Sequence, residues 1–293
     1  MLERYQATMP PAAGPIVLSD GPRTLTPDGE PRNTIRLGMP HLGPGGLCPN
    51  WLLRECAHGH WHAIAEDAGT TPRTLVDRGG HRCFASIVSA VIDGPLHAFR
   101  EGELARVEAQ QRPAARTGWR GVTRIATDRA SATVELVSAF ARRRGRSNRT
   151  LEAADMPHAM RAPGADRLPS RSRVLRSRAQ SFRLAAEADT TPLESVRVVA
   201  GSDFNGVGLF YFANFLRLFE RVEATALRGP WDLPPVVRRE IHWFGNADDG
   251  ETLDLVCEPT IRGVAPDTDI VTFASVRRRS DGVVIAASDA ERR

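Results

Sequence analysis

The stretch GSDFNGVGLFYFANFLRLFERVE, residues 201–223, sets an acid, an amide and two glycines directly before a strongly apolar run. A helix with this many aromatic and leucine side chains is apolar around most of its circumference, so it must be buried on nearly all sides. A second stretch, GMPHLGPGGLCPNWLLRECAHGHWHAIAE at 38–66, also leads from a polar, glycine-rich loop into an apolar helix. The repetition predicts two similar halves in one chain.

The predicted elements follow the same order in both halves. Pro49 suits the first turn of a helix, where its missing N–H group costs nothing, and β-branched apolar segments between turn residues indicate strands. In the first half we expect a strand at 32–38, a helix at 49–67 and strands at 82–92, 103–111, 119–127 and 131–141. In the second half we expect a strand at 193–201, a helix at 209–227 and strands at 236–245, 252–261, 270–279 and 282–290.

One long apolar helix for every five antiparallel strands requires a sheet that curls around the helix. This arrangement is the hot-dog fold, and two copies make a double hot-dog of the α+β class, with two curled antiparallel sheets side by side. The side chains that bury the second helix are Phe210, Phe212, Phe215, Leu216 and Phe219. We divide the chain into an N-terminal arm at 1–30, a first hot-dog repeat at 31–142, an Arg-rich connector at 143–184 and a second hot-dog repeat at 185–293.

Length and composition fit such a protein. The chain has 293 residues, 41% of them hydrophobic and 25% charged, which allows two domains of ordinary size. No apolar run approaches the length that spans a bilayer, the first residues show no secretion signal, and four cysteines are too few for a disulfide framework. We therefore expect a cytoplasmic protein without a membrane partner.

The 39 basic residues are all arginine. The absence of lysine excludes Schiff-base chemistry and a Walker-type phosphate lysine. Twelve arginines fall between Arg142 and Arg183 among several prolines, which indicates a solvated basic connector. The connector has no interleaved aromatic residues and no recognition-helix pattern, so we expect no nucleic acid as partner. The phosphates of coenzyme A or an acidic carrier protein stay open as alternative anions.

The two glycine-rich junctions are the candidate active sites. In a double hot-dog each loop faces the partner half, and a helix N-terminus offers unpaired N–H groups that polarise a carbonyl and stabilise an oxyanion. A carboxylate at Asp203 could activate water or act as a nucleophile. The alternative is that Asp203 and Asn205 only end the strand and start the helix. The residues expected to contact substrate are Gly45, Gly46, Leu47, Cys48, Gly206, Val207, Gly208 and Tyr211.

The segment DFNGVGLFYFANF resembles the pattern of hot-dog thioesterases, in which an Asp precedes a Gly ahead of the central helix. On this resemblance Asp203 takes the acid position and Gly206 takes the helix-cap position. One branch of these enzymes has a histidine after that glycine, where this chain has Val207. The departure counts against hydrolysis.

The segment GMPHLGPGGLCPNWLLRE is similar to the hallmark stretch of the leinamycin-type bifunctional acyltransferase/decarboxylases, double hot-dog proteins of polyketide biosynthesis. This resemblance implies decarboxylation of a malonyl-type (methylmalonyl) coenzyme A (CoA) thioester and transfer of the acyl group to an acyl carrier protein (ACP). It implies no cofactor beyond the coenzyme A or phosphopantetheine of the substrate. The alternatives are an acyl-CoA or acyl-ACP thioesterase that uses Asp203, and a non-catalytic relic that binds a carrier protein. A homodimer also stays open.

The tyrosine on which that family relies falls at Phe84 in this chain, which has no hydroxyl group. In the Gly-Pro loop, His41 could hydrogen-bond the thioester oxygen, and Asn50 could orient a carboxylate or cap the helix. The cluster CAHGHWH fits no zinc-module spacing, so we expect no metal. The candidate catalytic residues are therefore His41, Asn50, Phe84, Asp203 and Asn205, with Cys48, Cys83 and Tyr211 as further substitutes for the missing phenol.

Overall fold

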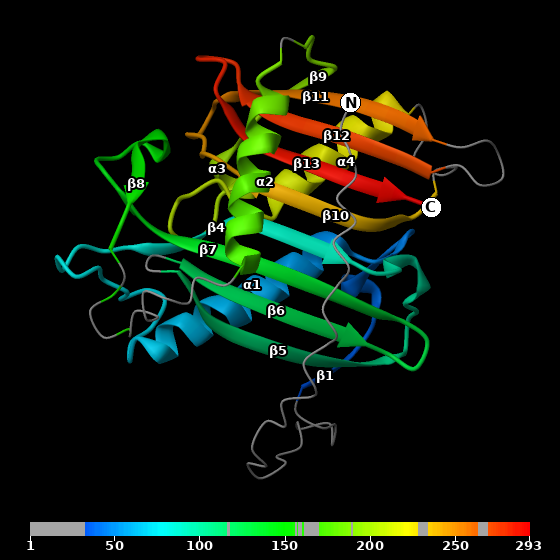
Figure 1. The fold of residues 1–293 in the computed structure, drawn as a ribbon, viewed down its shortest axis with the longest axis horizontal. Helices are drawn as coiled ribbons and strands as arrows, with labels where there is room; N and C mark the ends of the chain where they lie inside the picture. The colour runs from blue at the N-terminus through cyan, green and yellow to red at the C-terminus, as the bar shows by residue number, and fades with distance from the viewer. Residues whose placement is uncertain are drawn as a thin grey trace. The chain divides into compact units, whose positions relative to one another are not determined.

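Figure 1 shows the computed structural model of the chain, which describes residues 33–115, 118–155, 157, 160, 170–188, 190–227, 234–262 and 269–293. The chain divides into two compact units, Met1–Thr34 and Ile35–Arg293. The arm expected at 1–30 lies outside the described residues. The second unit holds nearly all of both predicted repeats, so it carries the fold and the candidate site.

The predicted helices and strands are present in the predicted order, and further helices and strands lie between them. The first half contains β1 (Thr34–Arg36), the hairpin strands β2 (Leu42–Gly43) and β3 (Gly46–Leu47), α1 (Pro49–Asp67), β4 (Phe84–Asp93), β5 (Leu104–Ala115), β6 (Gly118–Ala126), β7 (Ser131–Arg143) and β8 (Leu151–Ala153). After α2 (Ser170–Ala186), the second half contains β9 (Glu194–Arg197), α3 (Ala200–Asp203), α4 (Asn214–Ala226), β10 (Val236–Trp243), β11 (Thr252–Arg262), β12 (Asp269–Arg278) and β13 (Val284–Arg292).

All strands except the β2–β3 hairpin form one antiparallel sheet with the order β1-β5-β6-β7-β4-β10-β13-β12-β11-β9, and β8 pairs with β7 beside this path. The two halves have the same strand order from the outer edge of the sheet to its middle. This order is β1-β5-β6-β7-β4 in the first half and β9-β11-β12-β13-β10 in the second. The halves join where β10 pairs with β4, from Arg238 opposite Asp93 to His242 opposite Ser89. This repeated order with an edge-to-edge junction is the predicted double hot-dog.

The central helices α1 and α4 pack on one face of the sheet and share one hydrophobic core across both halves. Leu53 of α1 and Phe215, Leu216 and Phe219 of α4 are almost fully buried. Burying each such side chain stabilises the fold by about 1.5–3 kcal/mol. The two helix starts also contact each other, because Asn50 Nδ2 donates to Ala213 O at 2.6 Å.

The second central helix begins at Asn214, later than the predicted residue 209. Gly208 has a φ of 73°, which right-handed helix does not allow, and Phe204 pairs with Phe210 in an isolated β-bridge. The residues between α3 and α4 therefore form a compact loop. This loop supplies part of the candidate site.

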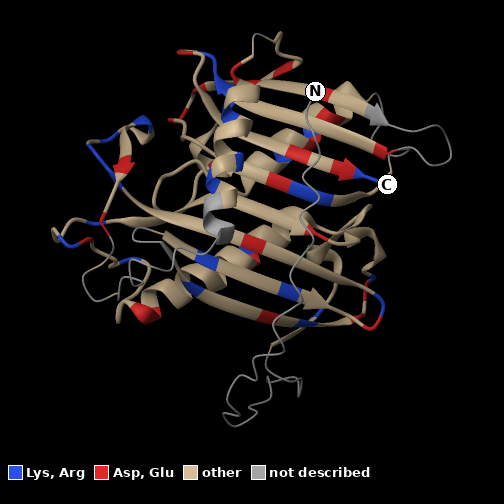
Figure 2. Cartoon of the chain, viewed as in Figure 1, with Lys and Arg blue, Asp and Glu red and all other residues tan. Residues whose placement is uncertain are grey.

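Helix α2 corrects the expectation of a solvated connector at 143–184. Its residues Leu175, Phe182 and Ala186 are buried, and the last two pack against Val284 and Ala287 of β13. The stripe repeats at helical spacing, but the surrounding arginines hide it in the sequence. In Figure 1, α2 crosses the face of the sheet opposite α1 and α4. Figure 2 shows arginine positions along α2 and both acidic and basic positions on the strands that it crosses.

A buried histidine on α1 predicts acid sensitivity. His60 Nδ1 lies 2.8 Å from Gln111 Oε1, and Nε2 lies 2.9 Å from Ser138 Oγ. Burial lowers the pKa of His60 from 6.5 to about 4. The unfolded chain therefore binds more protons than the native state between these values, so stability falls as pH drops through this window, by up to about 3 kcal/mol.

The variant His60→Gln removes this contribution. In urea unfolding at pH 7 and at pH 4.5, we expect the wild type to lose more stability than the variant by roughly 2–3 kcal/mol. Burial raises the pKa of Asp289 to about 6, so this group makes the native state more stable as pH drops, which is opposite to the effect of His60. Because the wild type and the variant both contain Asp289, its contribution cancels when the two proteins are compared. Equal losses in the two proteins would show that His60 is not neutral and buried.

Candidate functional site

A cavity of about 600 Å³ lies at the seam between the two halves. The pairing of β4 with β10 stops at Ser89 and His242. Beyond that point Phe84–Val88 and Trp243–Asn246 both line the cavity, which opens where the two strands part. Its volume falls in the range of small-molecule sites, roughly 300–1,000 Å³.

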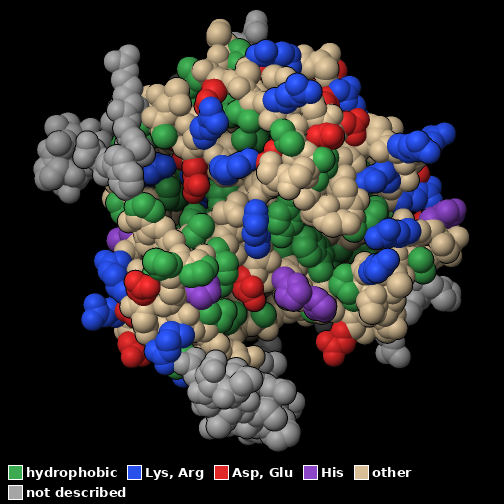
Figure 3. All heavy atoms as spheres, turned by 180° about the vertical axis from the view of Figure 1, so that it is seen from behind, with side chains coloured by type: hydrophobic (Ala, Val, Ile, Leu, Met, Phe, Trp, Pro, Cys, Tyr) green, Lys and Arg blue, Asp and Glu red, His purple; other side chains and the backbone are tan. Residues whose placement is uncertain are grey.

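Aromatic side chains build much of the cavity wall. Trp61 of α1 packs edge-on against Phe212 with ring centroids 5.9 Å apart, and Phe212 packs against Trp243 at 5.4 Å. Phe215 of α4 lines the same cavity. Figure 3 views the side of the sheet that carries α1 and α4, and hydrophobic side chains gather there in a hollow edged by histidine and arginine. Such a wall binds a hydrophobic group by removing it from water.

The loop between α3 and α4 presents a fixed amide to the cavity. Asn205 Oδ1 accepts hydrogen bonds from the N–H groups of Val207 and Leu209, both at 3.1 Å. These two donors fix the amide orientation and leave Asn205 Nδ2 without an acceptor among the described residues. The Gly206 N–H group also makes no hydrogen bond within that part of the chain. Asn205 and Gly206 both line the cavity, so the loop offers two donors to a carbonyl oxygen.

Asp203 lies behind this loop and supports it. Its side chain is buried and does not line the cavity. One carboxylate oxygen accepts the Val199 N–H group at 2.9 Å, and the other accepts Arg217 NH2 at 2.6 Å. Asn214 Nδ2 donates to the Asp203 carbonyl at 3.1 Å. The acid expected to activate water is therefore engaged in holding the two ends of the loop.

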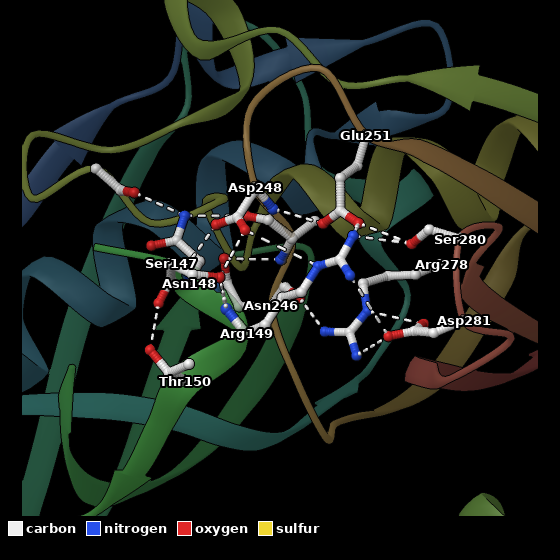
Figure 4. Close-up of polar contacts among 12 residues, drawn as sticks. Ser147, Asn148, Arg149, Thr150, Asn246, Asp248, Glu251, Arg278, Ser280 and Asp281 are labelled. Carbon is white, nitrogen blue, oxygen red and sulfur yellow. Dashed lines mark hydrogen bonds and ion pairs between the residues drawn. The ribbon is translucent and has the colours of Figure 1, made fainter. Parts of the chain in front are cut away.

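A polar wall closes the other side of the cavity and joins the two halves (Figure 4). Asn148, which follows β7, donates through Nδ2 to Gly208 O and Ala247 O, both at 2.9 Å. Arg278 of β12 donates to Asn246 O at 2.9 Å. The ion pairs of Arg149 and Arg278 use the carboxylates Asp248, Glu251 and Asp281. This wall is neutralised, so it offers hydrogen bonds rather than a free positive charge.

The glycine-rich loop of the first half lies away from the cavity. Gly46 has a φ of 94°, and a Cβ atom there would lie 2.3 Å from Leu96 O, so the loop packs directly on the chain after β4. Near this position, the pseudo-equivalent cleft has a volume of only about 30 Å³ and is lined in part by Arg239 and Glu220. The second-half junction therefore faces a cavity of substrate size, whereas the first-half loop does not line that cavity. The residues of the first-half loop that do not line this cavity are His41, Gly45, Gly46, Leu47, Cys48 and Asn50.

The candidates proposed to replace the missing phenol are dispersed. Phe84 lines the cavity at the start of β4. Tyr211 does not line it, and its half-buried ring lies against Trp61 and Arg54. Burial raises the pKa of Cys83 to about 11, so this buried thiol stays protonated. Of the predicted residues, the structure thus brings Phe84, Asn205, Gly206 and Val207 together, but not Gly208 or Tyr211.

Several cavity residues carry no sequence signal. Asn148, Glu152, Asn246 and Arg278 lie in separate segments with no motif around them. Strand pairing and loop contacts bring them together over long sequence distances, which no local pattern records. The only hint was the turn chemistry of NADDGE after β10.

Solved structures that are similar to the chain over most of its length include two thioesterases. An acyl-ACP thioesterase from Bacteroides thetaiotaomicron has a TM-score of 0.57 at 14% identity, covering 88% of this chain and 95% of that one. The 12:0-ACP thioesterase from Umbellularia californica has a TM-score of 0.57 at 9% identity, covering 89% and 92%. Both neighbours are described as ACP thioesterases. At this identity the likeness establishes the fold of the chain. No protein-family model and no curated protein matches the sequence.

Two kinds of feature are absent from the described residues. No three His, Cys, Asp or Glu side chains there gather in a way that would hold a metal ion. None of the helices in the described ranges combines the length and apolar character needed to cross a membrane.

Proposed function

We propose that the protein hydrolyses acyl thioesters, with the acyl group in the aromatic cavity and the thioester carbonyl at Asn205. The observation that carries this proposal is the fixed amide of Asn205, whose Nδ2 has no hydrogen-bond acceptor among the described residues and lies on an apolar cavity of about 600 Å³. The fold is shared with two acyl-ACP thioesterases, which supports an acyl-ACP or acyl-CoA substrate.

Asn205 Nδ2 and the Gly206 N–H group would hold the carbonyl oxygen as it becomes an oxyanion. Both donors sit on a loop that is fixed before substrate binds, since Asp203 and Asn148 hold it through hydrogen bonds. Donors fixed in this way need no reorganisation during the reaction, so their full electrostatic effect goes to the transition state. The apolar wall excludes water from one side and strengthens both hydrogen bonds.

The test is release of free thiol from acyl-CoA substrates of increasing chain length and from matching acyl-ACPs, followed by mass analysis of the acyl product. Hydrolysis yields the free carboxylic acid. An unchanged substrate that still binds would contradict hydrolysis and support the non-catalytic carrier-binding alternative.

A second candidate is the decarboxylating acyl transfer of the leinamycin-type enzymes. It is supported by Val207, which stands where one branch of thioesterases has a histidine, because loss of CO2 requires an oxyanion donor and a dry pocket but no base for water. Against it, the first-half loop that carries the resemblance does not line the cavity. Incubation with methylmalonyl-CoA and an ACP separates the two, since acyl transfer gives propionyl-ACP and hydrolysis gives free acid.

The variant His41→Ala tests whether the first-half loop takes part. His41 Nδ1 accepts the Gly38 N–H group at 2.9 Å, and its ring packs against Trp51. We expect kcat/KM for thioester hydrolysis to stay within about twofold of wild type, or about 0.4 kcal/mol of barrier, because His41 does not line the cavity. A loss of tenfold or more at unchanged thermal stability would mean that both junctions contribute.

A further inference from the structure

Hydrolysis requires a group that takes a proton from water, and the cavity offers few. Of the 30 residues that line it, Glu152 is the only one with a carboxylate, and none of the others is histidine, aspartate, cysteine, tyrosine or lysine. Arg149 and Arg278 also line the cavity, but guanidinium groups stay protonated and cannot accept a proton. Within the described lining, Glu152 is therefore the one side chain that can act as a general base.

Glu152 is held with one oxygen bound and one oxygen open. It lies on β8, where the register places it opposite Arg142 of β7. Arg142 Nε donates to Glu152 Oε1 at 2.7 Å, and Arg142 NH1 lies 3.4 Å from Asp77 Oδ2. Glu152 Oε2 makes no hydrogen bond or ion pair with the described residues. The hydrogen bond to Glu152 raises the pKa of Arg142, which keeps the cation in place.

The segment that carries Glu152 is fastened to the loop that carries Asn205. Arg143, opposite Leu151 in the β7–β8 pair, donates through NH2 to Val207 O at 3.0 Å. From the connection between the two strands, Asn148 Nδ2 donates to Gly208 O at 2.9 Å. The first half thus contributes the Glu152 carboxylate to the cavity, and the second half contributes the donors of Asn205 and Gly206. The hydrogen bonds of Arg143 and Asn148 connect the two segments directly.

We propose that Glu152 is the general base of the thioester hydrolysis, and this inference rests on the proposed function. The Glu152 carboxylate takes a proton from a water molecule as the water oxygen forms a bond to the thioester carbon. The carbonyl oxygen becomes an oxyanion at Asn205 Nδ2 and the Gly206 N–H group. Collapse breaks the C–S bond, and the leaving thiolate takes the proton back from Glu152, which gives the carboxylic acid and a free thiol.

The variants Glu152→Gln and Glu152→Ala test this role. We expect kcat for thiol release to fall at least about 100-fold in both, the lower end of the effect of a general base, with KM and thermal midpoint near wild type because Glu152 is partly exposed. Added formate should restore part of the activity of Glu152→Ala and none of Glu152→Gln, whose larger amide fills the space. Glu66→Gln, an exposed glutamate on α1 outside the cavity lining, is the matched control and should keep full activity.

The outcomes separate the two proposals. If the wild type hydrolyses thioesters and Glu152→Gln stays within a few-fold of it, the base is wrong and the proposed function stands. Loss of activity in Glu152→Ala without any rescue by formate would also overturn the proton-transfer role. If the wild type releases no thiol from any acyl-CoA or acyl-ACP, the proposed function itself fails and the assignment of Glu152 fails with it.

Discussion

Asn205→Asp is expected to lower kcat/KM for thioester hydrolysis by about 10²–10³-fold, or about 2.7–4 kcal/mol of transition-state stabilisation, the usual cost of one oxyanion donor. The substitution keeps an oxygen that can accept the N–H groups of Val207 and Leu209. It removes only the Nδ2 donor and sets a negative charge beside the developing oxyanion. The loop should therefore keep its structure while the chemistry fails.

A second variant separates the donor from the loop support. Asn205→Ala removes both the donor and the acceptor, so it should lose at least as much activity and also some thermal stability. Kinetics with one acyl-CoA and melting curves for both variants provide the comparison. If Asn205→Asp retains more than about a tenth of wild-type kcat/KM, it has lost less than about 1.4 kcal/mol of transition-state stabilisation. This loss is only about half of the smallest value expected for an oxyanion donor, so the result would contradict that role for Asn205.

Glu223→Gln is expected to cost about 3–5 kcal/mol of the free energy of unfolding, the range for removing one partner of a buried ion pair. Glu223 and Arg239 are almost fully buried. Glu223 Oε1 accepts Arg239 NH1 at 2.7 Å, and Oε2 accepts Arg239 NH2 at 2.8 Å and Arg292 NH2 at 2.9 Å. The neutral amide leaves two guanidinium groups without their shared counter-ion.

The exposed Glu258 of β11 gives the matched control for this variant. Glu258→Gln makes the same chemical change at the surface and should stay within about 0.5 kcal/mol of wild type in urea unfolding. A cost below about 1 kcal/mol for Glu223→Gln would mean that water reaches the pair. Arg239 also lines the small cavity of the first-half cleft, so the pair belongs to the packing that closes that cleft.

Much of the fold was predictable because its signals are local. The bounds of α1 agree with the predicted helix at 49–67, since Pro49 marks its start and apolar residues repeat along it. The order of strands along the chain, which is the same in the two halves, was predicted from β-branched apolar segments and the turn residues between them. Helix α2 was missed because its apolar stripe of Leu175, Phe182 and Ala186 is sparse among arginines, and only the sheet beneath it explains why it forms.

The candidate site was predictable only where one segment builds it. Asn205, Gly206 and Val207, which line the cavity, were predicted as site residues because a strand, a glycine loop and a helix follow each other there in the sequence. Glu152, which also lines the cavity, was not predicted, because it reaches the cavity through the pairing of β8 with β7 and lies in the arginine-rich segment. The first-half loop looked equivalent in sequence, but Gly46 packs closely on Leu96 and the loop does not line the seam cavity, and no local pattern reveals a contact between distant segments.

The central claim is that a thioester lies in the seam cavity with its carbonyl at the loop between α3 and α4. A crystal structure with an acyl-CoA analogue in which a methylene group replaces the thioester sulfur tests this most directly. The account predicts the acyl chain among Trp61, Phe212 and Trp243, with the ketone oxygen within hydrogen-bonding distance of Asn205 Nδ2. An analogue bound at the first-half junction, or on the face covered by α2, would contradict it.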